Sequence, residues 1–180
     1  MDRADELRFE AFVHASAPLL LRTAFLLTGD RGHAEDLLQQ ALERTARKWN
    51  RLDGAPEAYA RVVIVNLARD RWRRRKARVS ESPVAEVSDA ADAHDHADHV
   101  ATRDALITAL RLLPRRQRAV VVLRYFDQLT EAETAQALSI TVGTVKSTSS
   151  RALSRLRELL PDLASDDDAP LVTSCVEDRS

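Results

Sequence analysis

The sequence is poor in the residue types that build disulfide scaffolds, sheets and membrane spans. Its 180 residues include one cysteine, Cys175, four glycines and 4% aromatic residues. A single cysteine excludes an internal disulfide and a cysteine-based metal cluster. Scarce glycine and aromatic residues favour an all-α fold, in one domain or two small ones. No apolar run approaches about 20 residues and no basic-then-apolar segment begins the chain, so we expect a cytoplasmic protein.

Enzymatic machinery is also missing from the sequence. We find no Ser/His/Asp order, no Gly-rich phosphate loop and no metal-ligand spacing typical of a structural site. His94, His96 and His99 alternate with Asp95 and Asp98 and could be offered as metal ligands. That stretch lacks the apolar periodicity that would fix ligand geometry and a second shell. We therefore expect neither an enzyme, nor a cofactor, nor a bound metal.

Charge is distributed in alternating blocks, although the formal net charge is only −1. Residues 1–79 carry 16 basic and 11 acidic side chains, whereas residues 80–100 carry six acidic side chains and no lysine or arginine. Residues 101–160 carry ten basic and five acidic side chains, and residues 161–180 one and six. Because binding to nucleic acid depends on the local field, overall neutrality does not exclude a polyanionic partner. The pattern predicts two small helical domains, 1–79 and 101–161, joined by a flexible acidic linker at 80–100 and followed by an acidic tail at 162–180.

The first basic block has helical periodicity. Residues 6–28 are expected to be helical with a break at Pro18, because proline removes a hydrogen bond from a helix interior. A second helix is expected over residues 31–49, and its acidic and amide face is by itself most simply a solvated surface. After a loop at 50–56, a third helix begins at Pro56. Its β-branched run 62–65 could form a strand, but more than twenty residues without a turn signal favour a helix.

The end of this third helix carries a dense run of positive charge. Residues 69–78 contain seven basic side chains and one acidic one, Asp70. Such cations repel one another, which predicts a polyanion beside the helix. Tyr59 and Trp72 could stack on unpaired bases, although an aromatic residue at helical spacing is more often part of the core.

The second basic block ends in a helix-turn-helix pattern. Thr102 can cap a helix to Leu113, and Pro114 begins another that runs to Phe126. Thr130 and Glu133 then form a capping box that starts a short helix. Ser139 stands in the following turn, where glycine is usual, so we expect a strained backbone there.

A longer helix is expected from a cap at Thr141 to about Leu160. Small, hydroxyl and basic residues lie on its outer face, which suits entry into a DNA major groove. An ordinary bundle containing two amphipathic helices is the alternative interpretation. Ala132, Ala135, Leu138, Val142, Val145, Ala152, Leu156 and Leu160 are predicted to form the facing apolar stripes.

Four stretches occur together in an order that resembles a known family. They are Glu35 to Leu42, Tyr59 to Arg75, Leu113 to Phe126, and Leu129 to Leu156. Together they resemble the group-four, extracytoplasmic-function sigma factors of bacterial RNA polymerase, over about residues 6 to 160. The stretches 72–75 (WRRR) and 146–149 (KSTS) are most similar to the actinobacterial branch called SigE-like.

The resemblance implies a sigma factor that binds core RNA polymerase and promoter DNA and directs promoter-specific transcription initiation, with an anti-sigma factor as a candidate further partner. The implied polymerase-binding residues are Asp36, Leu37, Gln39 and Gln40. Those implied for opening the downstream promoter element, with a pocket for an unstacked base, are Asn50, Tyr59, Asn66, Arg69, Arg73 and Arg74. Those implied for the upstream element are Thr144, Lys146, Ser147 and Arg151, with phosphate contacts from Arg118, Arg124 and Arg155.

A stand-alone regulator is the main alternative interpretation. Such a protein would bind duplex DNA as a dimer through the helix-turn-helix, with the first domain as a partner or effector module. The arginine-rich helix beside an acidic and amide face distinguishes the two hypotheses, because a dimeric repressor needs neither feature.

Overall fold

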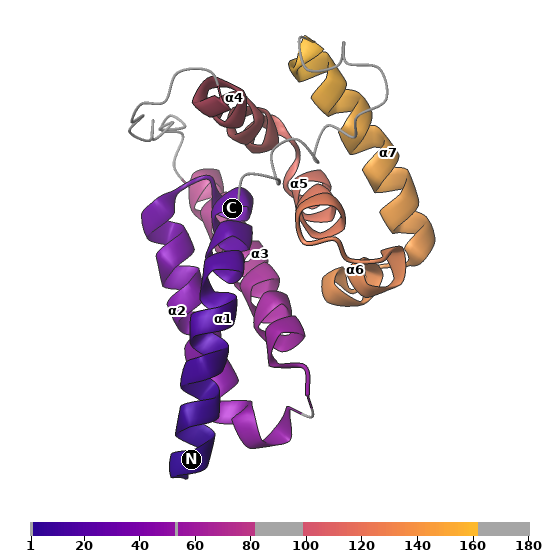
Figure 1. Cartoon of the computed structure of the whole chain (residues 1–180). Helices are drawn as coiled ribbons and strands as arrows, with labels where there is room; N and C mark the ends of the chain where they lie inside the picture. Colours follow the sequence, from indigo (N-terminus) through magenta and orange to yellow (C-terminus); the bar gives the residue numbers. More distant parts are fainter. Residues whose placement is uncertain (1, 53, 82–98, 162–180) are drawn as a thin grey trace. The chain divides into compact units, whose positions relative to one another are not determined.

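The structure is a computed structural model that describes residues 2–52, 54–81 and 99–161, apart from the side chains of 75–81 and 99–102. Its elements are helical throughout and contain no strand within those ranges, which confirms the predicted all-α class (Figure 1). The chain divides into two compact units, Met1–Asp92 and Ala93–Ser180. Most of the predicted acidic linker, with His94 and His96, and the tail with Cys175 lie outside the described residues.

The first unit is a three-helix bundle. It consists of α1 (Arg3–Thr28), α2 (Arg31–Lys48), a 3-10 turn η1 (Trp49–Arg51) and α3 (Pro56–Glu81). Each of the three long helices packs against the other two (Figure 1). Buried apolar residues from all three form the core, among them Leu20, Leu27, Ala34, Leu37, Ala41, Ile64 and Ala68.

Helix α1 is continuous, so the predicted break at Pro18 is wrong. Its ends follow local signals: the Asp2 carboxylate accepts from the Asp5 N–H at 2.8 Å, and Gly29 closes the helix with φ 71°. A proline inside a helix costs about 3 kcal/mol or more. Burial of the turns that follow, including Leu20 and Leu27, offsets that cost. The carbonyl that loses its N–H partner belongs to His14, which is exposed and can be hydrated.

Within the described residues, α1 alone has the length and apolar composition of a candidate membrane span. Those criteria are also met by core helices of globular domains. Leu20, Ala24 and Leu27 are fully buried, and α1 packs against both α2 and α3. The apolar character of α1 is therefore accounted for by the core of the bundle.

The second unit contains five helical elements within the described residues. They are α4 (His99–Leu112), α5 (Arg115–Val121), the π-helical turn η2 (Val122–Phe126), α6 (Glu131–Leu138) and α7 (Val142–Leu159). Helix α4 begins at His99, before the predicted cap at Thr102. Helix α7 packs against both α5 and α6, and Val120, Ala135 and Val145 meet at the centre.

The helix-turn-helix forms as its capping signals predict. The Thr130 hydroxyl accepts from the Glu133 N–H at 3.2 Å, and the Glu133 carboxylate accepts from the Thr130 N–H at 2.7 Å. Ser139 ends α6 with φ 54°, the left-handed conformation expected there. The Ile140 N–H then donates to the Ala135 carbonyl at 2.9 Å, which closes a Schellman turn. Thr141 caps α7 by accepting from the Thr144 N–H at 3.2 Å.

Two residues predicted on the apolar stripes lie at the surface instead. Ala132 is exposed, and Val142 is 40% exposed. Both belong to the first turn of their helix. Ala135, Val145, Ala152 and Leu156 are buried as predicted.

Candidate nucleic-acid interface

The outer face of α7 carries polar side chains that hydrogen-bond to one another or to the main chain of the helix. The Thr141 and Thr144 hydroxyls lie 2.8 Å apart, and the Ser147 hydroxyl donates to the Thr144 carbonyl at 3.3 Å. The Arg151 Nε donates to the Ser147 carbonyl at 3.1 Å. Lys146, Ser147 and Arg151 are exposed, and Thr144 is half-buried. This face offers hydroxyl and cationic donors without a large apolar side chain, as insertion into a major groove requires.

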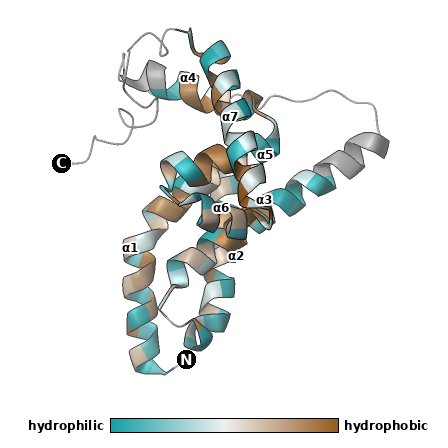
Figure 2. Cartoon of the chain, turned by 90° about the vertical axis from the view of Figure 1, so that its right-hand side faces the viewer, coloured by the Kyte–Doolittle hydropathy of each residue, from teal (hydrophilic) through white to brown (hydrophobic). Residues whose placement is uncertain are grey.

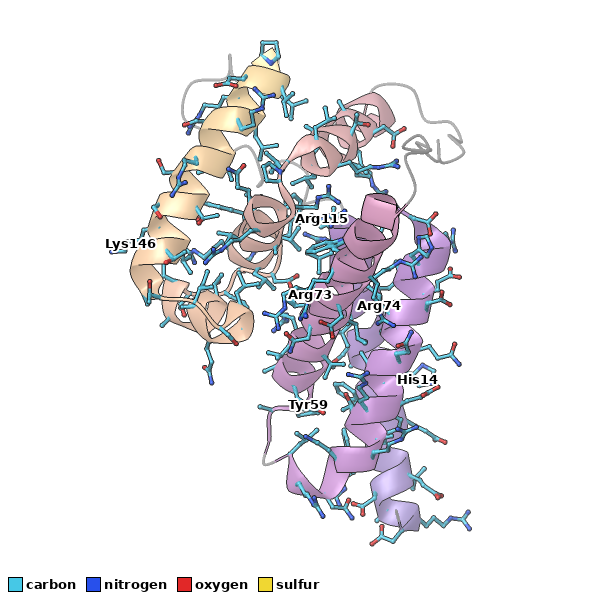
Figure 3. All side chains as sticks on the ribbon, turned by 180° about the vertical axis from the view of Figure 1, so that it is seen from behind. His14, Tyr59, Arg73, Arg74, Arg115 and Lys146 are labelled. Carbon is cyan, nitrogen blue, oxygen red and sulfur yellow. The ribbon has the colours of Figure 1, made fainter. Side chains whose placement is uncertain are left out.

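Lys146 has a partner that the sequence analysis did not identify. Its Nζ lies 3.6 Å from Oε2 of Glu131, the first residue of α6, and the two side chains are 64% and 38% exposed. Figure 3 shows Lys146 projecting outward from α7. The capping box locates Glu131 in the first turn of α6, but only the crossing of α6 and α7 brings its carboxylate to Lys146.

Arg118 departs from its expected place on the DNA-facing surface. It is 8% exposed, and its Nη2 donates to the main-chain carbonyls of Arg111 and Leu113. Burial lowers the pKa of Arg118 from its ordinary value to about 10, and the charges of Arg111 and Arg115 act in the same direction. It remains protonated at neutral pH. In this structure Arg118 joins α5 to the end of α4 rather than facing a ligand.

The two other arginines expected to contact phosphate in this unit are more accessible. Arg124 is half-buried; its Nη1 donates to the Leu129 carbonyl, and its guanidinium lies over the Tyr125 ring. Arg155 is exposed on α7 and pairs with Glu158 at 2.7 Å. Arg155 can exchange that surface pair for a phosphate at little cost, because exposed ion pairs contribute little to stability.

Helix α3 brings four predicted residues onto one face. Tyr59, Asn66, Arg69 and Arg73 lie within roughly 80° of one another around the helix axis at about 100° per residue. Tyr59 and Asn66 are half-buried, whereas Arg69 and Arg73 are exposed. The second half of α3 is strongly hydrophilic (Figure 2). The face thus changes from an aromatic and amide surface to a cationic one along the helix.

Arg74, expected beside this face, is exposed as well. Its Nε donates to the Asp70 carbonyl at 3.4 Å, and Arg73 lies 3.8 Å from the Asp70 carboxylate. Tyr59 lies beside the end of α2, because the Lys48 ammonium lies 5.2 Å from the centre of its ring. Tyr59, Arg73 and Arg74 are labelled along α3 in Figure 3.

A polar cavity of about 570 Å³ lies where α3 begins. It is lined by Asn50, Leu52, Gly54 and Pro56, by Trp49, and by Asp2, Asp5 and Arg8 at the start of α1. Trp49 packs edge-on against Phe9, with ring centres 5.1 Å apart, which fixes η1 against α1. The contribution of α1 could not be inferred from the sequence, because these residues are about forty positions or more from the loop.

An apolar groove of about 480 Å³ lies between α1 and α2. Gln39 lines it together with Leu38, Leu42 and Phe9. Asp36, Gln39 and Gln40 are exposed, as expected for a docking face. Leu37 is instead 4% exposed and belongs to the core, because it falls on the buried stripe with Ala34 and Ala41. Leu38 and Leu42 are the apolar residues that this surface offers.

Two family models match the chain, one in each unit. The model described as Sigma-70 region 2 matches residues 12–78, and the model described as Sigma-70, region 4 matches residues 103–156. The first match covers α2, most of α1 and the cationic face of α3. The second covers the helix-turn-helix.

Similar proteins span most of the chain. The RNA polymerase sigma-E factor of Streptomyces avermitilis is 41% identical over 89% of this chain and 89% of its own length. The ECF RNA polymerase sigma factor SigM of Mycobacterium tuberculosis is 34% identical over 87% of this chain and 79% of its own length. The chain belongs to the RNA polymerase sigma factors. It is a transcription initiation factor and not an enzyme. The family models and the relatives confirm the resemblance and the function predicted from the sequence.

A solved sigma factor has the same fold over its whole length. The Bartonella quintana sigma factor RpoE, solved in complex with the anti-sigma factor NepR, matches with a TM-score of 0.75 at 25% identity, covering 86% of this chain and 97% of that one. The match of a region 2 model to the first unit disfavours a stand-alone dimeric regulator, which would need only the helix-turn-helix.

Proposed function

We propose that this sigma factor binds core RNA polymerase through α2 and holds promoter DNA at two places, with α3 at the downstream element and α7 at the upstream element. One observation carries the proposal. An exposed acid and amide face, a cationic helix with a polar cavity at its start, and a helix-turn-helix with a polar outer face occur together in one chain. Each surface alone suits several protein classes, whereas the three together suit promoter-specific initiation.

The polymerase contact uses the α2 face with Asp36, Gln39 and Gln40, and the groove beside it. Leu38 and Leu42 give this surface an apolar centre, and the acid and amide side chains form a polar rim. This arrangement matches the anatomy of protein interfaces, in which a small apolar patch supplies most of the free energy of binding.

The downstream contact uses α3 and the loop before it. Arg69, Arg73 and Arg74 neutralise phosphates, and Tyr59 and Asn66 contact bases that have left the duplex stack. The cavity bordered by Asn50 accepts one unstacked base. Its polar lining and the rigid packing of Trp49 support this assignment, because a flipped base needs hydrogen-bonding groups that are already in position.

The upstream contact uses the outer face of α7. Thr144, Lys146, Ser147 and Arg151 face base edges in the major groove, while Arg155 and Arg124 contact phosphate. We leave Arg118 out of this surface because its guanidinium is committed to main-chain carbonyls.

We assign residues 1–79 to polymerase docking and opening, residues 101–161 to the upstream element, and residues 80–100 and 162–180 to an acidic tether and tail. The tether and the tail are rich in Asp and Glu, which disfavours stable contact between either segment and DNA. The proposed location is the cytoplasm. An anti-sigma factor is included as a partner, because the Bartonella relative was solved with one.

Size-exclusion chromatography with purified core RNA polymerase tests the docking surface. The full chain is expected to co-elute with core enzyme, and Asp36→Ala combined with Gln40→Ala is expected to weaken binding by about tenfold or more, as interface hot spots do. Glu6→Ala combined with Glu10→Ala, exposed on α1, is the matched control and is expected to bind like wild type. A wild-type chain that elutes as a stable homodimer without core enzyme would overturn the proposal.

A further inference from the structure

A carboxylate lies within the surface proposed to read the upstream element. Glu131 Oε2 lies 3.6 Å from Lys146 Nζ, and the pair joins the first turn of α6 to the second turn of α7. Ion pairs such as Arg31–Glu35 and Arg155–Glu158 instead join residues of one helix. The Glu131–Lys146 pair therefore links a proposed recognition side chain to a carboxylate outside its own helix.

Stability does not account for this pair. Both side chains are substantially exposed, and exposed pairs contribute little to folding. The first turn of α6 is already closed by the capping box between Thr130 and Glu133, which does not involve the Glu131 carboxylate. A negative charge at the edge of a DNA-binding face would ordinarily weaken binding to a polyanion. The position of Glu131 instead points to an effect on how Lys146 binds DNA.

Lys146 can bind DNA in two ways that differ in their effect on Glu131. A lysine ammonium is a compact, rotatable cation that reaches a phosphate on any sequence. If Lys146 turns away from α6 to reach a phosphate, Glu131 loses its partner and its carboxylate is left close to the DNA backbone, which repels it. If Lys146 instead donates to the O6 and N7 atoms of a guanine in the major groove without leaving α6, its third N–H can still donate to the carboxylate. The carboxylate thus destabilises the contact with a phosphate, which forms on any sequence, more than the contact with a guanine.

We propose that Glu131 is a specificity-determining residue of the upstream-element surface, which makes a phosphate contact by Lys146 less favourable than a contact with a guanine edge. This inference rests on the proposed function, since it requires α7 to lie in the major groove. Discrimination of this kind increases the difference in binding free energy between correct and incorrect DNA sites, because it weakens binding to the incorrect ones. It costs some total affinity.

Selection by the holoenzyme tests the inference. Core RNA polymerase is loaded with full-length chain and mixed with a promoter library whose upstream element is randomised, and the retained DNA is sequenced. The forms compared are wild type, Glu131→Gln, Lys146→Gln and the double variant. Glu131→Gln is expected to relax base preference roughly fivefold or more at the position that Lys146 contacts, with other positions unchanged. In the Lys146→Gln background, Glu131→Gln is expected to change nothing further.

Two further variants separate charge from structure. Glu131→Asp keeps the carboxylate and is expected to retain most of the wild-type preference, and Glu158→Gln removes an exposed carboxylate elsewhere on α7 and is expected to leave preference unchanged. Unchanged preference in Glu131→Gln, or equal relaxation with and without Lys146, would overturn the inference alone. A wild-type holoenzyme that enriches no upstream sequence would overturn the proposed function and this inference together.

Discussion

Arg118 donates a hydrogen bond from Nη2 to the main-chain carbonyl of Arg111, and so ties the start of α5 to the last turn of α4. It also reaches the Leu113 carbonyl at 3.5 Å. Arg118→Met is expected to lower the free energy of unfolding of the second unit by about 1–3 kcal/mol, because buried carbonyls lose their donor. Thermal unfolding of the full chain measures this.

The neighbouring Arg116 provides a control for Arg118. It is exposed in the first turn of α5, so Arg116→Met is expected to change stability by less than about 0.5 kcal/mol. If Arg118→Met left stability unchanged but flattened the salt dependence of DNA binding, Arg118 would be a phosphate contact after all.

The cationic end of α3 is expected to make promoter opening and DNA affinity depend on salt concentration. Arg73→Ala combined with Arg74→Ala is expected to weaken promoter opening, because both side chains are exposed on the helix proposed to face DNA. The slope of log affinity against log salt is expected to fall by about 0.7–0.9 for each phosphate that the variant no longer neutralises. Permanganate footprinting of the open complex over a series of salt concentrations measures both quantities. Arg103→Ala combined with Arg116→Ala, both exposed in the second unit, is the charge-matched comparison, and an unaltered slope in the α3 variant would argue against α3 as a DNA-binding helix.

The outer face of α7 is expected to set the preference for the DNA sequence of the upstream element. Lys146→Ala combined with Ser147→Ala is expected to change upstream-element preference by about 1–3 kcal/mol for each base edge that these side chains bind. Competition between promoters that differ only in this element, measured with holoenzyme, gives the quantity directly. Uniform weakening on every sequence would mean that the two side chains touch phosphate alone.

The left-handed backbone at Ser139, in the turn between α6 and α7, is expected to favour glycine and so to affect the stability of the second unit. Ser139 adopts φ 54°, a conformation that costs a non-glycine residue about 1–2 kcal/mol. Ser139→Gly is expected to raise the melting temperature of the second unit, with a gain in unfolding free energy of about 1 kcal/mol or less because glycine also makes the unfolded chain more flexible. Ser150→Gly, at an exposed position inside α7, is expected to lower stability by about 0.5 kcal/mol. A loss of stability in both variants would show that the Ser139 side chain stabilises the turn.

Features decided within a few residues could be predicted from the sequence. The capping box at Thr130, the cap at Thr141 and the stop at Gly29 depend on side chains and backbone one turn away. The strained position of Ser139 follows from the same local chemistry. These signals placed the ends of the helix-turn-helix correctly, because little outside it competes with them.

Features decided by packing could not be predicted in the same way. The cost of Pro18 is local, but the burial of Leu20 and Leu27 that outweighs it comes from α2 and α3. Leu37 and Arg118 lie in stretches that resemble the sigma factors. Whether each side chain faces solvent depends on how the neighbouring helices pack against it. The pairing of Glu131 with Lys146 depends on how α6 and α7 cross.

Run-off transcription from a fragmented genomic template, with purified core RNA polymerase and start-site sequencing, tests the central claim most directly. We expect the full chain to direct initiation to a reproducible set of sites that share an upstream and a downstream element at fixed spacing. Transcription no more selective than that of core enzyme alone, with protein shown to be folded and free of any inhibitor, would contradict the account.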